Sequence, residues 1–233
     1  MISELIQVQS ALWLLATLLC YVAALQLHRL CKGHPITHPL VGTAALLSVF
    51  LLLSKTTVES YQQSAWLLHW GLGLVTVALA LPIYRQWQKL KVYGWPLTLS
   101  VFVGGVLAPL LAWGVLFALN APLSLQFTML AKSITTPLAM ETVKYIGGVP
   151  ALAAVFVIVT GIVGAVVAGS IFSVFGINNS HAQGVALGTV AHAVGTAKAI
   201  HMGDEVAAMA TLGLCVNGIF TALVLPMLFV LLC

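Results

Sequence analysis

The stretch GVALGTVAHAVGTAKAI, from Gly184 to Ile200, is apolar enough for a membrane but also carries hydroxyl, imidazole and ammonium groups. On an ideal helix, which turns by about 100° per residue, its small residues form one stripe and three polar residues form a neighbouring face. Small-residue stripes let membrane helices approach closely, whereas polar groups at that depth are costly and usually functional. The stretch therefore predicts one half of a binding site. The stripe consists of Gly184, Gly188, Ala191 and Gly195, and the polar face of Thr189, His192 and Thr196.

The composition of the chain is that of a membrane protein. Of its 233 residues, 61% are hydrophobic and 6% are charged, whereas about a quarter of the residues in a soluble domain are charged. The net charge of +4 comes from a few basic residues, mostly at the ends of apolar runs, so it does not indicate a nucleic-acid partner. The cysteines and histidines show no metal-binding spacing, and no nucleophile–base motif indicates an enzyme.

The apolar runs predict the fold class. We expect an all-α polytopic membrane protein of about eight transmembrane segments with interrupted helices, because about 20 residues cross a bilayer as a helix. These segments would form a single integral membrane domain over residues 1–233. Basic residues follow the first and third segments, which places those loops in the cytoplasm and the N-terminus outside. The expected segments are Ala11–Leu30, Pro39–Leu53, Trp66–Tyr84, Trp95–Leu119, Phe127–Tyr145, Val149–Phe175, Gly184–Ile200 and Val206–Cys233.

The other half of the predicted site lies in LAKSITTPLAMETVKYIGGVP, from Leu130 to Pro150, early in the motif-bearing half of the chain, residues 127–233. Pro137 has no amide hydrogen for the carbonyl of Ser133, so the helix is interrupted there. Hydroxyl groups stabilise such a break and can also bind a ligand. Interrupted helices that face an anionic substrate are a device of secondary transporters. The polar residues of this stretch include Lys132, Ser133, Thr135, Thr136, Glu141 and Lys144.

Several of these residues also have a plain structural explanation. Pro137 alone would fit a kinked helix whose lysine reaches the membrane surface. Glu141 and Lys144 are spaced to pair with each other on one helix face. His192 could be a proton relay, a substrate contact or a hydrogen bond between helices. The combination of charges, hydroxyls and proline favours a site, because ionisable groups within a membrane are usually functional.

The two stretches resemble each other, which suggests an internal repeat. Aligning Ser133 with Thr189 pairs SITTPLAMETVKYIG with TVAHAVGTAKAIHMG, so that Gly147 falls on Gly203. Transporters often build one site from two related broken helices. We therefore expect breaks near Pro137 and Gly195 that face each other.

Two long motifs, KSITTPLAMETVKYIGGVPALAAVFVIVTGIVGAVVAG at residues 132–169 and GVALGTVAHAVGTAKA at residues 184–199, closely resemble the LrgB/CidB family of bacterial membrane proteins. The stretch TVALALPIYRQ, residues 76–86, resembles the family as well. The resemblance extends from Pro39 to the C-terminus. One departure is Lys198, where arginine is usual in the family.

The resemblance implies two alternative functions. The first is secondary transport of small monocarboxylates of the pyruvate, glycolate and glycerate class, since a relative is the plastid glycolate/glycerate translocator. The second is a holin-like or antiholin-like role, in which the protein modulates murein hydrolase activity and autolysis with a small LrgA/CidA-type membrane partner. We favour transport, because a lesion needs an oligomer with a polar face rather than broken helices with inward-facing hydroxyls.

The resemblance also implies site residues, partners and a location. We expect a multi-pass protein of the bacterial cytoplasmic (inner) membrane, in contact with lipid, the carboxylate and further copies of the chain. Lys132 and Lys198 would neutralise the substrate, Glu141 or His192 would carry a proton, and no metal or cofactor is expected. The expected substrate-binding residues are Lys132, Ser133, Thr135, Thr136, Pro137, Glu141, Thr189, His192, Gly195, Thr196 and Lys198.

Overall fold

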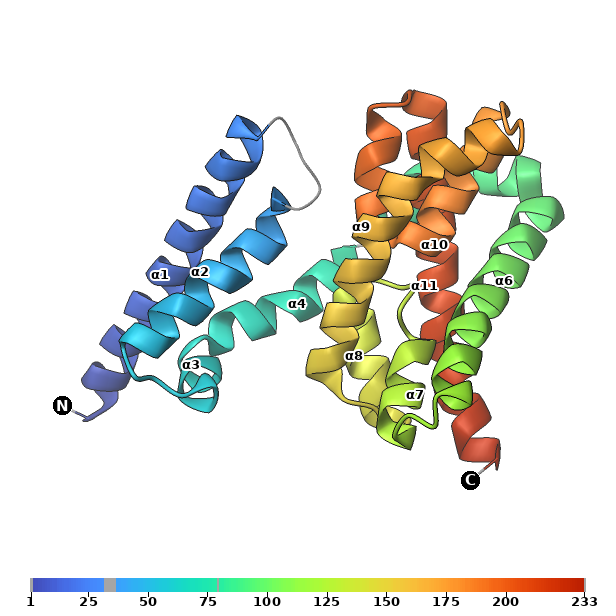
Figure 1. The fold of residues 1–233 in the computed structure, drawn as a ribbon. Helices are drawn as coiled ribbons and strands as arrows, with labels where there is room; N and C mark the ends of the chain where they lie inside the picture. Colours follow the sequence, from blue (N-terminus) through green and yellow to red (C-terminus); the bar gives the residue numbers. More distant parts are fainter. Residues whose placement is uncertain (1, 32–36, 79, 233) are drawn as a thin grey trace. The chain divides into compact units, whose positions relative to one another are not determined.

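The computed structural model describes residues 2–31, 37–78 and 80–232, and the elements that these residues form are α-helices (Figure 1). The expected all-α fold is therefore confirmed. The chain divides into two units, Met1–Val75 and Thr76–Cys233. The single integral domain expected over residues 1–233 stays a prediction.

The N-terminal unit contains α1 (Ile2–Leu30), α2 (Pro39–Leu53), α3 (Val58–Ser64) and most of α4 (Trp66–Ala78). Proline suits the first position of α2, because its fixed φ is that of a helix. Thr57 caps α3 by accepting a hydrogen bond from the amide of Ser60. The Trp13 ring of α1 lies 5.5 Å from the rings of both Phe50 and Tyr61. These aromatic contacts hold α1, α2 and α3 together.

Four helices of the described residues are long and apolar enough to cross a membrane. They are α1 from Gln9 to Leu30, α6 (Trp87–Ala118), α9 (Pro150–Val174) and α11 (Asp204–Leu232). The pair α2 and α3, bent by 112°, would raise the number to five if it forms one span. The chain is thus a membrane protein by the length and composition of its helices, but eight spans are not confirmed.

The second unit is built on α6, α9 and α11, together with α5 (Ala80–Arg85), α7 (Leu123–Leu130), α8 (Thr136–Tyr145) and α10 (Ser180–Ile200). Gly94 bends α6, because its φ of 29° lies outside the helical region. The straight part of α6 therefore begins at Trp95, where the sequence predicted a segment to start. Cys233, the last residue of the segment expected at the C-terminus, lies outside the described residues.

The helices α7 and α8 form a hairpin instead of the crossing expected over Phe127–Tyr145 (Figure 1). The amide of Val149, just after α8, donates to Thr128 Oγ1 of α7 at 2.8 Å, so the chain returns to lie beside α7. The hairpin packs against the start of α9 and the last turns of α11. This packing buries Ala131, Ile134, Ala139, Val143, Ile146, Ala153 and Val157.

A second hairpin is formed by α10, whose backbone breaks at His192 and so divides the element into two arms. His181 Nε2, at its start, lies 2.6 Å from Glu205 Oε1 at the start of α11. Both ends of α10 therefore lie at one end of the unit, and the crossing expected over Gly184–Ile200 is replaced by a return.

The first arm of α10 packs closely on α11. A Cβ built on Gly184 would lie 2.5 Å from the carbonyl oxygen of Val206, and one on Gly188 would overlap that of Ala210. Two residues of the small-residue stripe, Gly184 and Gly188, thus permit the close approach that the sequence predicted, and their partner is the following helix. The second arm returns beside α9.

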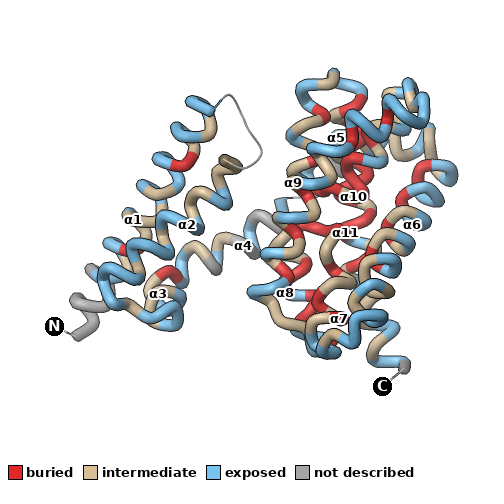
Figure 2. Tube along the Cα trace, in the orientation of Figure 1, coloured by how far each residue is buried: buried red, intermediate tan, exposed pale blue. Residues whose placement is uncertain are grey.

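The two hairpins enter the second unit from opposite ends and meet at its centre, where Figure 2 shows buried residues in α8, α10 and α11. Each hairpin is followed by a long helix, α9 or α11, and these two helices run in opposite directions (Figure 1). Gly147 and Gly203, which the sequence alignment pairs, stand between hairpin and long helix with φ of 79° and 129°. Glycine suits both turns because it adopts positive φ at little cost.

Candidate functional site

The first break separates α7 from α8 at residues 131–135. Pro137 lies in the first turn of α8, where a missing amide hydrogen costs little, and not within a continuous helix. Thr135 is the N-cap residue, but its side chain makes no capping hydrogen bond. The first amide groups of α8 are therefore left without a side-chain cap.

The second break is at His192, where φ is 40° and ψ is −128°, so the break expected near Gly195 is wrong in position. Such a backbone is costly for a residue with a side chain and persists only when its surroundings hold it. The imidazole supplies this hold, since Nε2 lies 2.8 Å from the carbonyl oxygen of Val157 in α9. Gly161 makes room for the ring, because a Cβ there would lie 2.6 Å from its Cε1 atom.

Gly195 has another role in the same hairpin. It is buried in the returning arm, and a Cβ on it would overlap the carbonyl oxygen of Leu187 in the entering arm. These two residues could not touch in a straight helix, because eight residues span about 12 Å. Glycine is therefore needed where the arms meet, three residues after the break itself.

Asn217 of α11 joins the two breaks. Its Nδ2 donates to the carbonyl oxygens of Ser133 and Thr189, each at 3.0 Å. The sequence predicted that Pro137 leaves the carbonyl of Ser133 without its helical donor. The hydrogen bond from Asn217 to this carbonyl confirms that prediction. The two breaks consequently approach within hydrogen-bonding reach of one nitrogen atom, as the sequence predicted when it placed them face to face.

Four buried side-chain atoms in the described part of the chain have no hydrogen-bond partner there. All four belong to predicted site residues, whose exposed fractions are 2% for Ser133, 8% for Thr135, 2% for Thr189 and 3% for His192. An unpartnered polar group in such a place costs about 1–3 kcal/mol. Their grouping at the two breaks defines the candidate site. The atoms are Ser133 Oγ, Thr135 Oγ1, Thr189 Oγ1 and His192 Nδ1.

The two lysines expected to neutralise a carboxylate lie in different surroundings. Lys132 is half-buried beside the first break and is an electrostatic neighbour of His192. Its side chain makes no hydrogen bond or ion pair with residues 2–31, 37–78 or 80–232. Lys198 instead donates to the carbonyl oxygen of Ala165 in α9. Ala165 is eight residues beyond Val157, the contact of His192, so Lys198 is not brought to the hydroxyl groups.

The remaining predicted residues are spread around the two breaks. Glu141 forms an ion pair with Lys144 at 2.6 Å, and both side chains are exposed. The pair is therefore explained as a surface ion pair on one helix face, as its spacing in the sequence allowed. Thr196 donates to the carbonyl oxygen of His192 at 2.9 Å and stabilises the returning arm. Thr136 is half-buried at the start of α8. None of these three presents an unpartnered buried atom within the described ranges.

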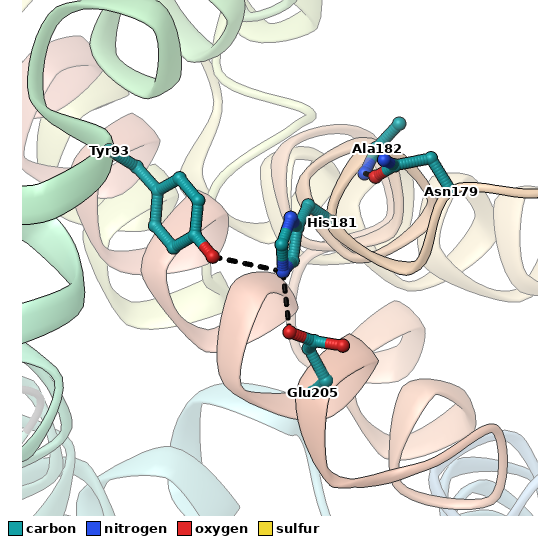
Figure 3. Close-up of polar contacts among 5 residues, drawn as sticks. All are labelled: Tyr93, Asn179, His181, Ala182 and Glu205. Carbon is teal, nitrogen blue, oxygen red and sulfur yellow. Dashed lines mark hydrogen bonds and ion pairs between the residues drawn. The ribbon is translucent and has the colours of Figure 1, made fainter.

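A cavity of about 430 Å³ lies between α6, α10 and α11 and reaches Thr189. At the outer end of α10, His181 Nε2 lies 3.1 Å from the Tyr93 hydroxyl and 2.6 Å from Glu205 Oε1 (Figure 3). Asn179 caps α10 beside this cluster by accepting from the amide of Ala182 at 3.0 Å. Tyr93 and His181 both line the cavity.

Sequence reasoning missed Asn217, although a signal was available. It is an amide near the middle of a 29-residue helix of otherwise mainly apolar residues. Polar residues at that depth are usually functional, so the position could have been singled out. Gly105, which leaves room for the amide, carried no such signal because its role depends on contact with another helix.

Comparison with known proteins gives the family. The sequence model of the LrgB-like family matches residues 17–231, beginning earlier than the Pro39 expected from the motifs. Proteins named "Antiholin-like protein LrgB" from Bacillus mycoides (strain KBAB4) and Bacillus cereus (strain B4264) are each 31% identical over 214 residues. The match covers 92% of this chain and 93% of each relative. No solved structure matches the chain significantly. The chain belongs to the LrgB-like family.

Proposed function

We propose that the chain is a secondary transporter of small monocarboxylates, of the pyruvate, glycolate and glycerate class. The carrying observation is the group of four unpartnered buried atoms at two facing breaks. A carboxylate in such a place needs several donors, and the hydroxyls of Ser133, Thr135 and Thr189 supply them. The uncapped start of α8 adds partial positive charge.

Lys132 is the group best placed to offset the charge of the substrate. Lys132 belongs to the first break and is an electrostatic neighbour of His192, and its ammonium has no ion-pair partner among the described residues. A carboxylate bound there would gain a charge-assisted hydrogen bond, which is stronger than a neutral one. The positive charge of Lys132 would in turn be neutralised, so substrate and lysine stabilise each other.

His192 would act on the rest of the substrate. Since Nε2 faces the carbonyl oxygen of Val157, it must carry a hydrogen, and Nδ1 of the neutral ring is then an acceptor. A 2-hydroxyl group can donate to this atom. When protonated, Nδ1 can donate to an oxygen instead, so His192 is our proposed proton carrier, whereas Glu141 is already paired with Lys144.

Uptake into sealed proteoliposomes tests this proposal. Labelled pyruvate and glycolate should enter with saturation, and an uncharged solute of similar size should stay outside. Thr189→Val should raise KM, because it removes an unpartnered hydroxyl from the site without changing the shape of the side chain. Thr211→Val is the matched control, since its hydroxyl bonds within its own helix to the carbonyl of Ala207 at 2.8 Å. Unsaturable entry of both kinds of solute would refute transport and indicate a lesion.

The second candidate function is an antiholin-like one, which the names of the relatives favour. In this case the chain would modulate murein hydrolase activity and autolysis, together with a small LrgA/CidA-type membrane protein. Autolysis of cells that express Thr189→Val distinguishes the two candidates. A variant that has lost carboxylate uptake but retains a normal effect on autolysis would separate the two functions.

The proposed setting is the bacterial cytoplasmic membrane, crossed several times by a chain that forms oligomers with further copies of itself. Four helices of sufficient length, and a bent pair that counts as a fifth span if it crosses as one, support a multi-pass arrangement. The basic residues in the last turn of α1 support an N-terminus outside the cell.

A further inference from the structure

Asn217 is the most deeply placed polar residue of α11. Its side chain is fully buried, and both hydrogens of its amide group go to backbone carbonyls of the two breaks. Its oxygen accepts a hydrogen bond from Thr221 at 3.4 Å. Gly105 of α6 leaves room for the same oxygen, because a Cβ there would overlap it. The amide therefore bridges the two hairpins at a place where α6 carries no side chain.

The two bonded carbonyls belong to residues that also supply hydroxyls to the site. Ser133 and Thr189 each present one unpartnered buried oxygen, and each is tied by its backbone to Nδ2. The two hydrogens of an amide group stand at a fixed angle on one planar nitrogen. The separation of the two backbone carbonyls is consequently set by a single rigid group, and the hydroxyls belong to the same two residues.

We propose that Asn217 is a positioning residue that sets the separation of the two breaks and thereby the size of carboxylate that the site accepts. The size-selecting part of this role rests on the proposed transport function. The bridging part does not, because it concerns two hydrogen bonds within the protein.

Gly105→Ala tests the bridge without altering Asn217 itself. The added methyl group must displace the amide, since it would overlap the Asn217 oxygen. Gly114→Ala is the matched control on the same helix, because a Cβ there meets nothing within 4 Å. Both variants replace a helical glycine by alanine, so they change helix propensity alike.

Two measurements are made on the full-length protein. The first is amide hydrogen exchange at residues 131–135 and 189–193 without added carboxylate. Exchange should rise in Gly105→Ala by about tenfold at both breaks, because they share one donor group. The second is the KM for glycolate and for the larger glycerate in proteoliposomes. In Gly105→Ala both KM values should rise by different factors, so that the ratio of the glycerate KM to the glycolate KM changes. Gly114→Ala should leave both the amide exchange and this KM ratio as in the parent protein.

Unchanged exchange, or a rise at one break alone, would overturn the bridge. A rise at both breaks with an unchanged KM ratio would overturn the size-selecting role. If the parent protein transports no carboxylate, the proposed function fails, and exchange still decides the bridge. Should Gly105→Ala not accumulate, Asn217→Ser replaces it, because the smaller side chain cannot clash and retains one donor. Amide hydrogen exchange in Asn217→Ser should then rise at one or both breaks. Exchange at the parent rate at both breaks would overturn the proposal.

Discussion

Lys132 and Lys198 provide a test of the site at the level of single residues. Lys132→Met should raise the KM for carboxylate by about tenfold or more, because it removes a charge that has no ion-pair partner among the described residues and would pair with the substrate. Lys198→Met should change KM by less than about twofold, because its ammonium bonds to the carbonyl of Ala165, two helical turns from the contact of His192. The measurement is uptake by proteoliposomes at equal protein content. Equal effects of the two substitutions would contradict this assignment.

Gly195 is predicted to stabilise the α10 hairpin by allowing its two arms to touch. Gly195→Ala places a Cβ against a backbone oxygen that cannot rotate away, so the arms must separate. We expect a loss of about 1–3 kcal/mol in stability, the range for overpacked interiors. Thermal unfolding of the detergent-solubilised protein measures it. Gly114→Ala, which meets nothing within 4 Å, should unfold at or above the parent temperature.

The residues show how far sequence reasoning could reach. Pro137 announces a break by its own chemistry, since it removes one specific hydrogen bond from the carbonyl of Ser133. His192 has no such local mark. Its backbone is held by the carbonyl of Val157 and by the space beside Gly161, which lie about thirty positions or more away in the sequence. A break that depends on another helix cannot be located from local pattern, and the expected position near Gly195 is three residues too late.

At the scale of elements, the sequence could not distinguish a return from a crossing. The stretches over Phe127–Tyr145 and Gly184–Ile200 have the length of a spanning helix, and length is the usual criterion. What makes them return is the contact between their ends, His181 with Glu205 and Thr128 with Val149. These contacts join residues 24 and 21 positions apart, which no local pattern indicates.

Cysteine labelling distinguishes the two arrangements. In a background without native cysteines, Asn178→Cys and His201→Cys flank α10 and should react with an impermeant thiol reagent from the same side of the membrane. Leu119→Cys and Tyr145→Cys flank the α7–α8 hairpin and should both react from the other side. All four residues are exposed. Labelling of the α10 pair from opposite sides would mean that α10 crosses, contrary to the hairpin.

At the scale of the whole molecule, the inverted arrangement of the two hairpins predicts transport in both directions. Each hairpin reaches the centre from its own side, so substrate could leave past either of them. Vesicles preloaded with unlabelled glycolate should therefore accumulate labelled glycolate faster than empty vesicles. Vesicles preloaded with an uncharged solute are the control. Identical initial rates in all three preparations would contradict reversible exchange through one site.

The order in which the chain is synthesised gives Asn217 a further consequence. Both hairpins leave the ribosome before α11, which carries the amide that binds them. Until α11 is inserted, two released carbonyls lack their donor, which is expensive in lipid. Completion of this part of the fold thus waits until α11 has been made and inserted. A nascent chain that stops before α11 would leave the carbonyls of Ser133 and Thr189 without this donor. We expect such a chain to be degraded by the proteases that remove incomplete membrane proteins.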